Sequence, residues 1–229
     1  MMKTPQTPWV LILLMSLIFF LGIFAPSVVI SETQKPPTED ELVRLLTPLS
    51  SVKIDEFKKF GPNVLPVLTK VYGKSDLSAR ATIAWIFYEL RWPSKEAKAA
   101  LMKDVHTPDS KLRLQVQWAL GRVSADPDVV KTLLENMQND NNPLFRDKAA
   151  CALASDQIHL TEKQKFQLYE GLIKALEDSK PDVRSIAIKA LQIQTGQDKG
   201  FSPNAPEEQR KEKLREWKQW LQKYQSALL

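Results

Sequence analysis

Four arginine residues recur along this chain at nearly constant spacing. Arg80, Arg113, Arg146 and Arg184 are separated by 33, 33 and 38 residues, and the same apolar frame surrounds each of them. Self-similarity at a fixed period indicates a repeat architecture. A leucine stands twelve residues before each arginine, and apolar residues follow it at three and seven residues. These positions are Leu68, Leu101, Leu134 and Leu172, then Ile83, Val116, Ala149 and Ala187, then Phe87, Leu120, Leu153 and Leu191.

This repeat predicts the fold class. A helical hairpin cannot bury its apolar face alone, so neighbouring hairpins must stack around one shared core. We therefore expect an all-α protein, an α-solenoid of about four to five helical hairpins. Apolar periodicity, prolines and capping residues place its helices. The arginine-bearing helices are expected over 77–90, 110–123, 143–154 and 181–194, and their partners over 63–72, 95–105, 128–138 and 162–177.

The two ends of the chain have a different character. Lys3 precedes an uncharged apolar run from Trp9 to Phe24, the arrangement of a secretory signal. The alternative is a retained membrane anchor, since the longer stretch from Trp9 to Ile30 could nearly span a bilayer, which takes about 20 apolar residues. Both alternatives predict export. The domains expected are a signal peptide or anchor (1–31), a linker (32–37), the solenoid (38–196), and a loop with a C-terminal capping helix (197–229).

The repeat frames resemble a known family. DLSARATIAWIF, DSKLRLQVQWAL, NPLFRDKAACAL and PDVRSIAIKAL are similar to HEAT repeats of the short bacterial type, also called phycobilisome-lyase-like HEAT repeats. The resemblance covers roughly residues 38–196, and the C-terminal segment looks like the end of many exported bacterial HEAT proteins. It implies a ladder of hydrogen bonds that braces the turns between repeats. The ladder residues it implies are Asp76 with Arg80, Asp109 with Arg113, Asn142 with Arg146, and Asp178 or Asp182 with Arg184, where Lys180 departs from the pattern.

One further column of the repeat is a candidate binding site. Ten residues before the arginines stand Lys70, Lys103, Asn136 and Lys174, on the partner helices. Stacking aligns equivalent positions, so these residues would form a basic row facing an acidic protein surface. An ordinary solvated helix face is the alternative. A second column, at five residues after the arginines, holds Trp85, Trp118, Cys151 and Lys189, and we expect its tryptophans to pack against adjacent helices.

No pattern of reactive residues points to catalysis. His106 and His159 are expected in solvated turns, and neither has the neighbours that metal binding needs, so no metal or cofactor is predicted. Cys151 stands among alanines and leucine and is expected to be a small buried hydrophobe. No catalytic residue is assigned.

The expected function is an exported, periplasmic or otherwise extracytoplasmic, non-catalytic scaffold that binds a protein. Its partner would have an acidic surface, and membrane contact would be confined to the N-terminal segment. A bilin-lyase-like enzyme is an alternative that only the family resemblance suggests. Binding of nucleic acid is a third, which the net charge of +5 favours and export disfavours.

Overall fold

The computed structural model describes residues 35–228, and the predicted signal or anchor segment lies outside this range. The described part contains helices and no strand. They are α1 (Glu39–Leu45), α2 (Ile54–Lys58), α3 (Val64–Lys74), α4 (Leu77–Leu90), α5 (Lys95–Asp104), α6 (Ser110–Val123), α7 (Pro127–Asn139), α8 (Pro143–Ser155), α9 (Glu162–Ala175), α10 (Pro181–Thr195) and α11 (Glu207–Ser226), with short 3-10 turns at Leu49–Ser51 and Gly61–Asn63.

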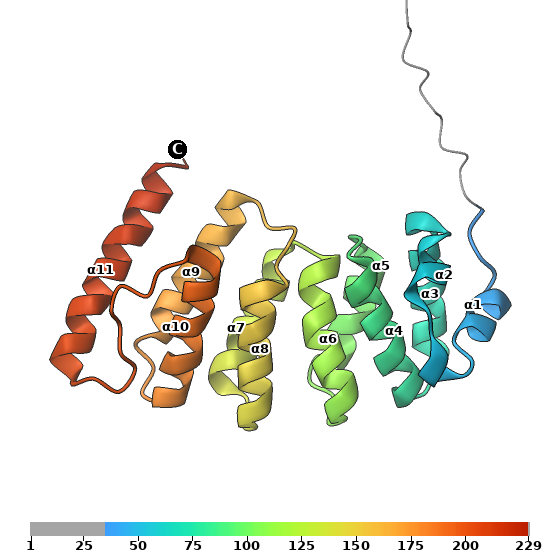
Figure 1. The fold of residues 1–229 in the computed structure, drawn as a ribbon, viewed down its shortest axis with the longest axis horizontal. Helices are drawn as coiled ribbons and strands as arrows, with labels where there is room; N and C mark the ends of the chain where they lie inside the picture. The colour runs from blue at the N-terminus through green and yellow to red at the C-terminus, as the bar shows by residue number, and fades with distance from the viewer. Residues whose placement is uncertain (1–34, 229) are drawn as a thin grey trace, which may run out of the picture. The chain divides into compact units, whose positions relative to one another are not determined.

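The helices follow one another in chain order, as Figure 1 shows. The arginine-bearing helices α4, α6, α8 and α10 pack consecutively against one another. Their partners form a second layer, in which α1 packs on α3, α3 on α5, α7 on α9, and α9 on α11. This arrangement confirms the predicted α-solenoid.

Local chemistry sets the helix ends. Thr38 forms a capping box with Glu41 at the start of α1, and Thr161 forms one with Gln164 at the start of α9. Helices α7, α8 and α10 each carry proline in their first turn, where a backbone donor is not needed. Gly196 ends α10 in the left-handed conformation that favours glycine.

The core runs along the repeat frame. All eight apolar residues that stand three and seven residues after the arginines are fully buried, from Ile83 and Phe87 in α4 to Ala187 and Leu191 in α10. Of the leucines that stand twelve residues before, Leu68, Leu101 and Leu172 are fully buried, whereas Leu134 is half-buried. The shared core therefore explains why this pattern repeats.

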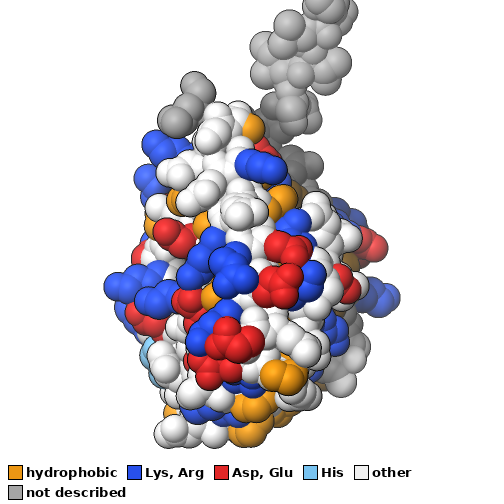
Figure 2. Space-filling model, turned by 90° about the vertical axis from the view of Figure 1, so that its left-hand side faces the viewer, with side chains coloured by type: hydrophobic (Ala, Val, Ile, Leu, Met, Phe, Trp, Pro, Cys, Tyr) orange, Lys and Arg blue, Asp and Glu red, His pale blue; other side chains and the backbone are white. Residues whose placement is uncertain are grey.

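Helix α11 closes one end of the stack. It packs on α9 through Trp217, which is fully buried, and Leu214, with Leu221 and Tyr224 partly buried beside them. Figure 2 views this end and shows blue and red side chains interspersed over the middle of the face, with orange side chains gathered mainly at the lower edge. A terminal element needs such a polar outer face because nothing stacks beyond it. Within residues 35–228, no helix combines the length and apolarity that a membrane crossing requires.

Candidate protein-binding surfaces

The repeated arginines connect successive repeats. Arg80 donates from Nε to the carbonyl of Ser75 at 3.0 Å, and its Nη1 lies 3.4 Å from Oδ2 of Asp104 at the end of α5. Arg113 is paired with Asp140, the residue that follows α7, and its guanidinium carbon lies 4.3 Å from the centroid of the Phe145 ring. Each arginine thus holds the turn of the following repeat.

Arg146 also pairs with a carboxylate of the following repeat, whereas Arg184 hydrogen-bonds only to backbone carbonyls. Arg146 donates to the carbonyl of Asp140 at 2.8 Å and is paired with the carboxylate of Asp182. Arg184 donates to the carbonyls of Asp178, Ser179 and Pro203. Of the two acids proposed for Arg184, Asp182 therefore serves Arg146, and Asp178 contributes its backbone oxygen.

The implied polar partners Asp76, Asp109 and Asn142 have another role in the structure. Each is the N-cap of its own helix and accepts a backbone N–H there, from Ala79, Leu112 and Leu144 respectively. Capping by such residues stabilises a helix by about 1 kcal/mol. These residues brace the turns, but the carboxylates that meet the arginines are Asp104, Asp140 and Asp182. The sequence named only Asp182 among these, and as a partner of Arg184 rather than of Arg146.

Three members of the predicted basic row are available to a partner. Lys70, Lys103 and Lys174 are exposed, and none of them forms an ion pair with another residue of the range 35–228. Neighbouring lysines differ, since Lys74 is paired with Glu39 at 2.6 Å and Lys98 with Asp126 at 2.7 Å.

Asn136 does not belong to this row, and the prediction was wrong here. Its side chain is only 3% exposed, and it lines a cavity of about 510 Å³ together with His106, Arg113 and Phe145. A short amide fits this enclosed position on α7 beside the arginine ladder, whereas a lysine there would have to bury its charge. The exposed row is therefore interrupted at the third repeat.

A groove separates α7 from α9 and includes the last lysine of the row. Its volume is about 730 Å³, and Val130, Leu134 and Gly171 supply apolar surface inside it. Gly171 permits this close packing, because a Cβ atom there would lie 2.3 Å from Cδ1 of Leu134. Charges of both signs surround the apolar surface, from Asp128, Lys131, Glu135, Glu170 and Lys174. Apolar surface rimmed by polar groups is typical of protein-binding sites.

The second column packs much as expected. Trp85 and Trp118 are half-buried against the core, and the Trp118 ring lies 6.0 Å from that of Tyr88. Cys151 is half-buried rather than fully buried, and burial raises the pKa of its thiol, which disfavours the reactive thiolate.

The two histidines differ from each other. His106 is exposed, as expected, but His159 is not a solvated turn residue: its Nε2 lies 3.0 Å from the carbonyl oxygen of Arg91 and 2.6 Å from that of Arg122. The connection between α8 and α9 folds back onto α6 and brings this ring with it. In the part of the chain that the structure describes, no group of three or more His, Cys, Asp or Glu residues could hold a metal ion.

Comparison with known proteins agrees with the geometry. Residues 64–154, which span α3 to α8, match the family model described as HEAT repeats. No curated protein matches the chain. The match, together with the stacked helical layers, supports a HEAT-repeat protein, a helical repeat scaffold of the kind commonly used for protein interaction.

Proposed function

We propose that this chain is an exported, non-catalytic HEAT-repeat scaffold that binds a protein with an acidic surface. The observation that carries the proposal is the layer formed by α3, α5, α7 and α9. It presents three exposed lysines without ion pairs, and the last of them borders the groove between α7 and α9. We call Lys70, Lys103 and Lys174 the lysine row.

Charge supports an acidic partner. The lysine row forms no ion pair among the described residues, while Lys74 and Lys98 on the same helices are already paired with carboxylates. Exposed charges of one sign attract an oppositely charged partner over about a Debye length, near 8 Å at physiological salt. The apolar surface beside Lys174 then supplies contact area once the partner arrives.

A non-catalytic role is supported by the surroundings of Cys151, the one cysteine of the sequence. Burial raises the pKa of its thiol, and the negative charge of Asp147 raises it further, which disfavours a reactive thiolate. The proposed mechanism is surface presentation: stacked hairpins hold many shallow contacts in fixed register, and no reactive centre is required.

Export rests on the sequence before residue 35. Lys3 followed by the apolar run from Trp9 to Phe24 is the basis of this part of the proposal. A reporter enzyme fused after Glu41 should be active outside the cytoplasm. Activity confined to the cytoplasm would exclude export and leave the binding proposal untouched.

The binding proposal is tested by reversing the charge of the lysine row. The triple variant Lys70→Glu, Lys103→Glu and Lys174→Glu should fold with an unchanged circular dichroism spectrum, because all three side chains are exposed. Proteins captured by proximity labelling with the wild-type chain should fall at least tenfold in yield with this variant. Capture by the wild type should also weaken as salt is raised.

A matched control carries the same charge change elsewhere. Lys53, Lys111 and Lys189 are also exposed and without ion pairs among the described residues, and the last two lie on α6 and α10 in the other layer. Their triple change to Glu should leave capture intact. If both triple variants lose capture equally, the effect is one of net charge and not of the lysine row. If the lysine-row variant captures as much protein as the wild type, the binding surface lies elsewhere.

A further inference from the structure

The last arginine of the ladder lacks a carboxylate. Arg80, Arg113 and Arg146 each reach one from the following repeat, whereas within residues 35–228 no carboxylate hydrogen-bonds to Arg184. All of its acceptors are backbone carbonyls. Yet Arg184 is only 5% exposed, which makes it the least exposed of the four. A buried charge without a counter-ion is energetically costly.

A second guanidinium lies close to it. Arg210, in the first turns of α11, donates one hydrogen bond, from Nη1 to the carbonyl of Ala205 at 2.6 Å, and forms no ion pair within the described range. Burial lowers the pKa of Arg184, and the positive charge of Arg210 lowers it further. Asp178 acts in the opposite direction but more weakly. The two cations therefore repel each other, and within residues 35–228 neither forms an ion pair with Glu177, Asp178 or Glu207, the acidic residues that line this region.

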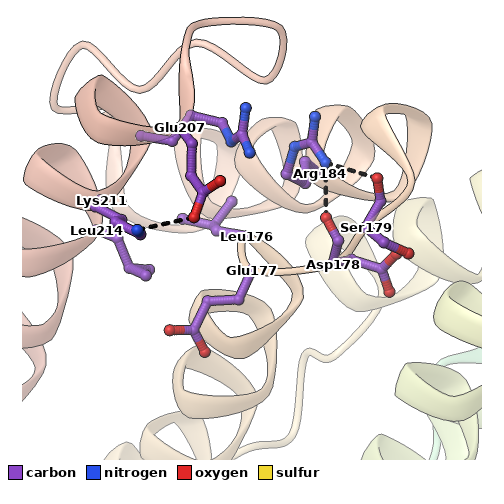
Figure 3. A pocket seen from close by; sticks show the side chains of 9 residues that line it. Leu176, Glu177, Asp178, Ser179, Arg184, Glu207, Lys211 and Leu214 are labelled. Atoms are coloured by element: carbon purple, nitrogen blue, oxygen red, sulfur yellow. Dashed lines mark hydrogen bonds and ion pairs between the residues drawn. The ribbon is translucent and has the colours of Figure 1, made fainter.

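A cavity of about 350 Å³ adjoins both groups. The end of α9, the start of α10 and the first turns of α11 enclose it, and Figure 3 shows Arg184 on one side and Glu207 with Lys211 on another. Two of its three acidic residues are already in ion pairs, since Glu207 lies 2.8 Å from Lys211 and Glu177 lies 2.6 Å from Lys218, and the third, Asp178, accepts a hydrogen bond from the backbone N–H of Lys180. Helix α11 begins at Glu207, and its N-cap residue, Pro206, provides no side-chain cap for the first N–H groups. Uncapped N–H groups and the helix dipole favour an anion there.

We propose that this cavity binds a carboxylate group, which completes the arginine ladder at its last position. The ligand would accept hydrogen bonds from Arg210 and from the remaining Nη2 hydrogen of Arg184. A carboxylate is the anion that the three preceding arginines hold, and its two oxygens match the fork of a guanidinium. Glu177, Asp178 and Glu207 border the cavity, and they repel a singly charged carboxylate less than a doubly charged phosphate.

The carboxylate has two sources, an acidic side chain of a bound protein or a free small acid. The first source rests on the proposed function, and the second does not. We favour the protein source, since a scaffold for an acidic partner would meet this cavity at the end of its stack. The lysine row takes no part in lining the cavity, so the two proposals can fail separately.

The experiment is a titration of the full-length chain followed by the NMR signals of arginine Nε–H groups. The probes are a blocked pentapeptide, Gly-Gly-Glu-Gly-Gly, its Gln counterpart, sodium acetate and sodium phosphate, all at constant ionic strength. The Glu peptide should give saturable shifts at two arginine signals, and the Gln peptide should not. Arg210→Gln should weaken binding at least tenfold. Arg215→Gln, which removes the same charge from an exposed site on the same helix, should bind as the wild type does.

The outcomes separate the alternatives. Equal binding by Arg210→Gln and the wild type, equal shifts with the Gln peptide, or tighter binding of phosphate than of acetate would overturn the carboxylate site. Acetate binding at least as tightly as the Glu peptide would retain the site and overturn the protein source. The lysine-row variant should still bind the Glu peptide, so failure of the scaffold proposal leaves this result unchanged.

Discussion

Nε and Nη2 of Arg122 lie 2.9 and 2.8 Å from Oδ1 of Asp156, which ties the last turn of α6 to the residue that follows α8. Both side chains are largely buried. The Arg122 guanidinium also donates from Nη2 to the hydroxyl of Tyr88 at 2.7 Å and lies 3.5 Å from the centroid of that ring. With His159 bound to two helix-end carbonyls, the longer connection between α8 and α9 is an integral part of the stack.

Removing the acid of this pair should be strongly destabilising. Burial raises the pKa of Asp156, and Arg122 acts against that effect. In Asp156→Ala the buried guanidinium loses its counter-ion, so unfolding free energy should fall by about 3–5 kcal/mol. Asp147→Ala is the control, because Asp147 is more exposed and should cost at most about 1 kcal/mol. Urea denaturation of both variants measures this, and equal losses would show that the pair does not anchor the connection.

Replacing Gly121 or Gly73, both in helices, with alanine should change the stability of the protein in opposite directions. At Gly121 a Cβ atom would lie 2.7 Å from the carbonyl oxygen of Asp156 and 2.3 Å from Nε2 of Gln157. This overpacking, about 1–3 kcal/mol, exceeds the gain of about 1 kcal/mol in helix propensity. At Gly73 no atom lies within 4 Å of the added Cβ, so Gly73→Ala should stabilise by about 0.4–1 kcal/mol. Thermal melts that shift in the same direction for both variants would contradict the packing at Gly121.

The sequence predicted most of the fold because local signals mark the helices. The arginine-bearing helices α4 and α6 have the predicted bounds, 77–90 and 110–123, since capping aspartates stand directly before them. The core positions followed from the repeat, because every hairpin must bury the same face. These features depend on nearby residues and on periodicity alone.

The interaction partners were harder to predict because they depend on three-dimensional packing. Asp104, Asp140 and Asp182 stand nine, six and two residues before the next arginine, so no constant spacing identifies them. Asn136 shares a repeat column with Lys103 but is buried, because equivalent positions need not have equivalent surroundings in each repeat. The contacts of His159 join it to residues 68 and 37 positions away, beyond the reach of local patterns.

The ion pair between Asp182 and Arg146 should make the free energy of unfolding depend on pH. Its hydrogen bond with Arg146 is the main cause that lowers the pKa of Asp182 below its ordinary value of 3.8. The folded state then binds fewer protons than the unfolded state between the two pKa values. The stabilisation is present above pH 3.8 and is lost as pH falls through the folded value. Wild type should therefore be more stable than Asp182→Asn near pH 6 and lose that advantage towards pH 2. Urea titrations at several pH values measure this difference. If the unfolding free energies of the two proteins differed by the same amount at every pH, the prediction would be contradicted.

The arginine within the HEAT-repeat match should matter more than its exposed neighbour. Arg113→Ala leaves Asp140, which is 5% exposed, without its cation, so unfolding free energy should fall by about 1–3 kcal/mol. Lys103→Ala changes an exposed side chain and should stay within about 0.5 kcal/mol. Denaturation midpoints with unchanged slopes would attribute the difference to the folded state. Negligible effects of both changes would mean that the ladder does not hold the repeats.

Substitutions at Trp217 test whether α11 unfolds separately from the distant repeats. The ring is fully buried, lies 5.4 Å from the ring of Trp220, and has Nζ of Lys199 4.9 Å from its centroid. Trp217→Ala should cost about 3–5 kcal/mol through the cavity left between α11 and α9. Trp217→Phe keeps an aromatic ring and removes a buried Nε1 that has no acceptor, so its cost should be smaller. Because each repeat contacts only its neighbours, hydrogen exchange in Trp217→Ala should accelerate in α11 and α9 while α4 and α6 stay protected. Uniform acceleration across all helices would show that α11 and the rest of the stack unfold as one cooperative unit.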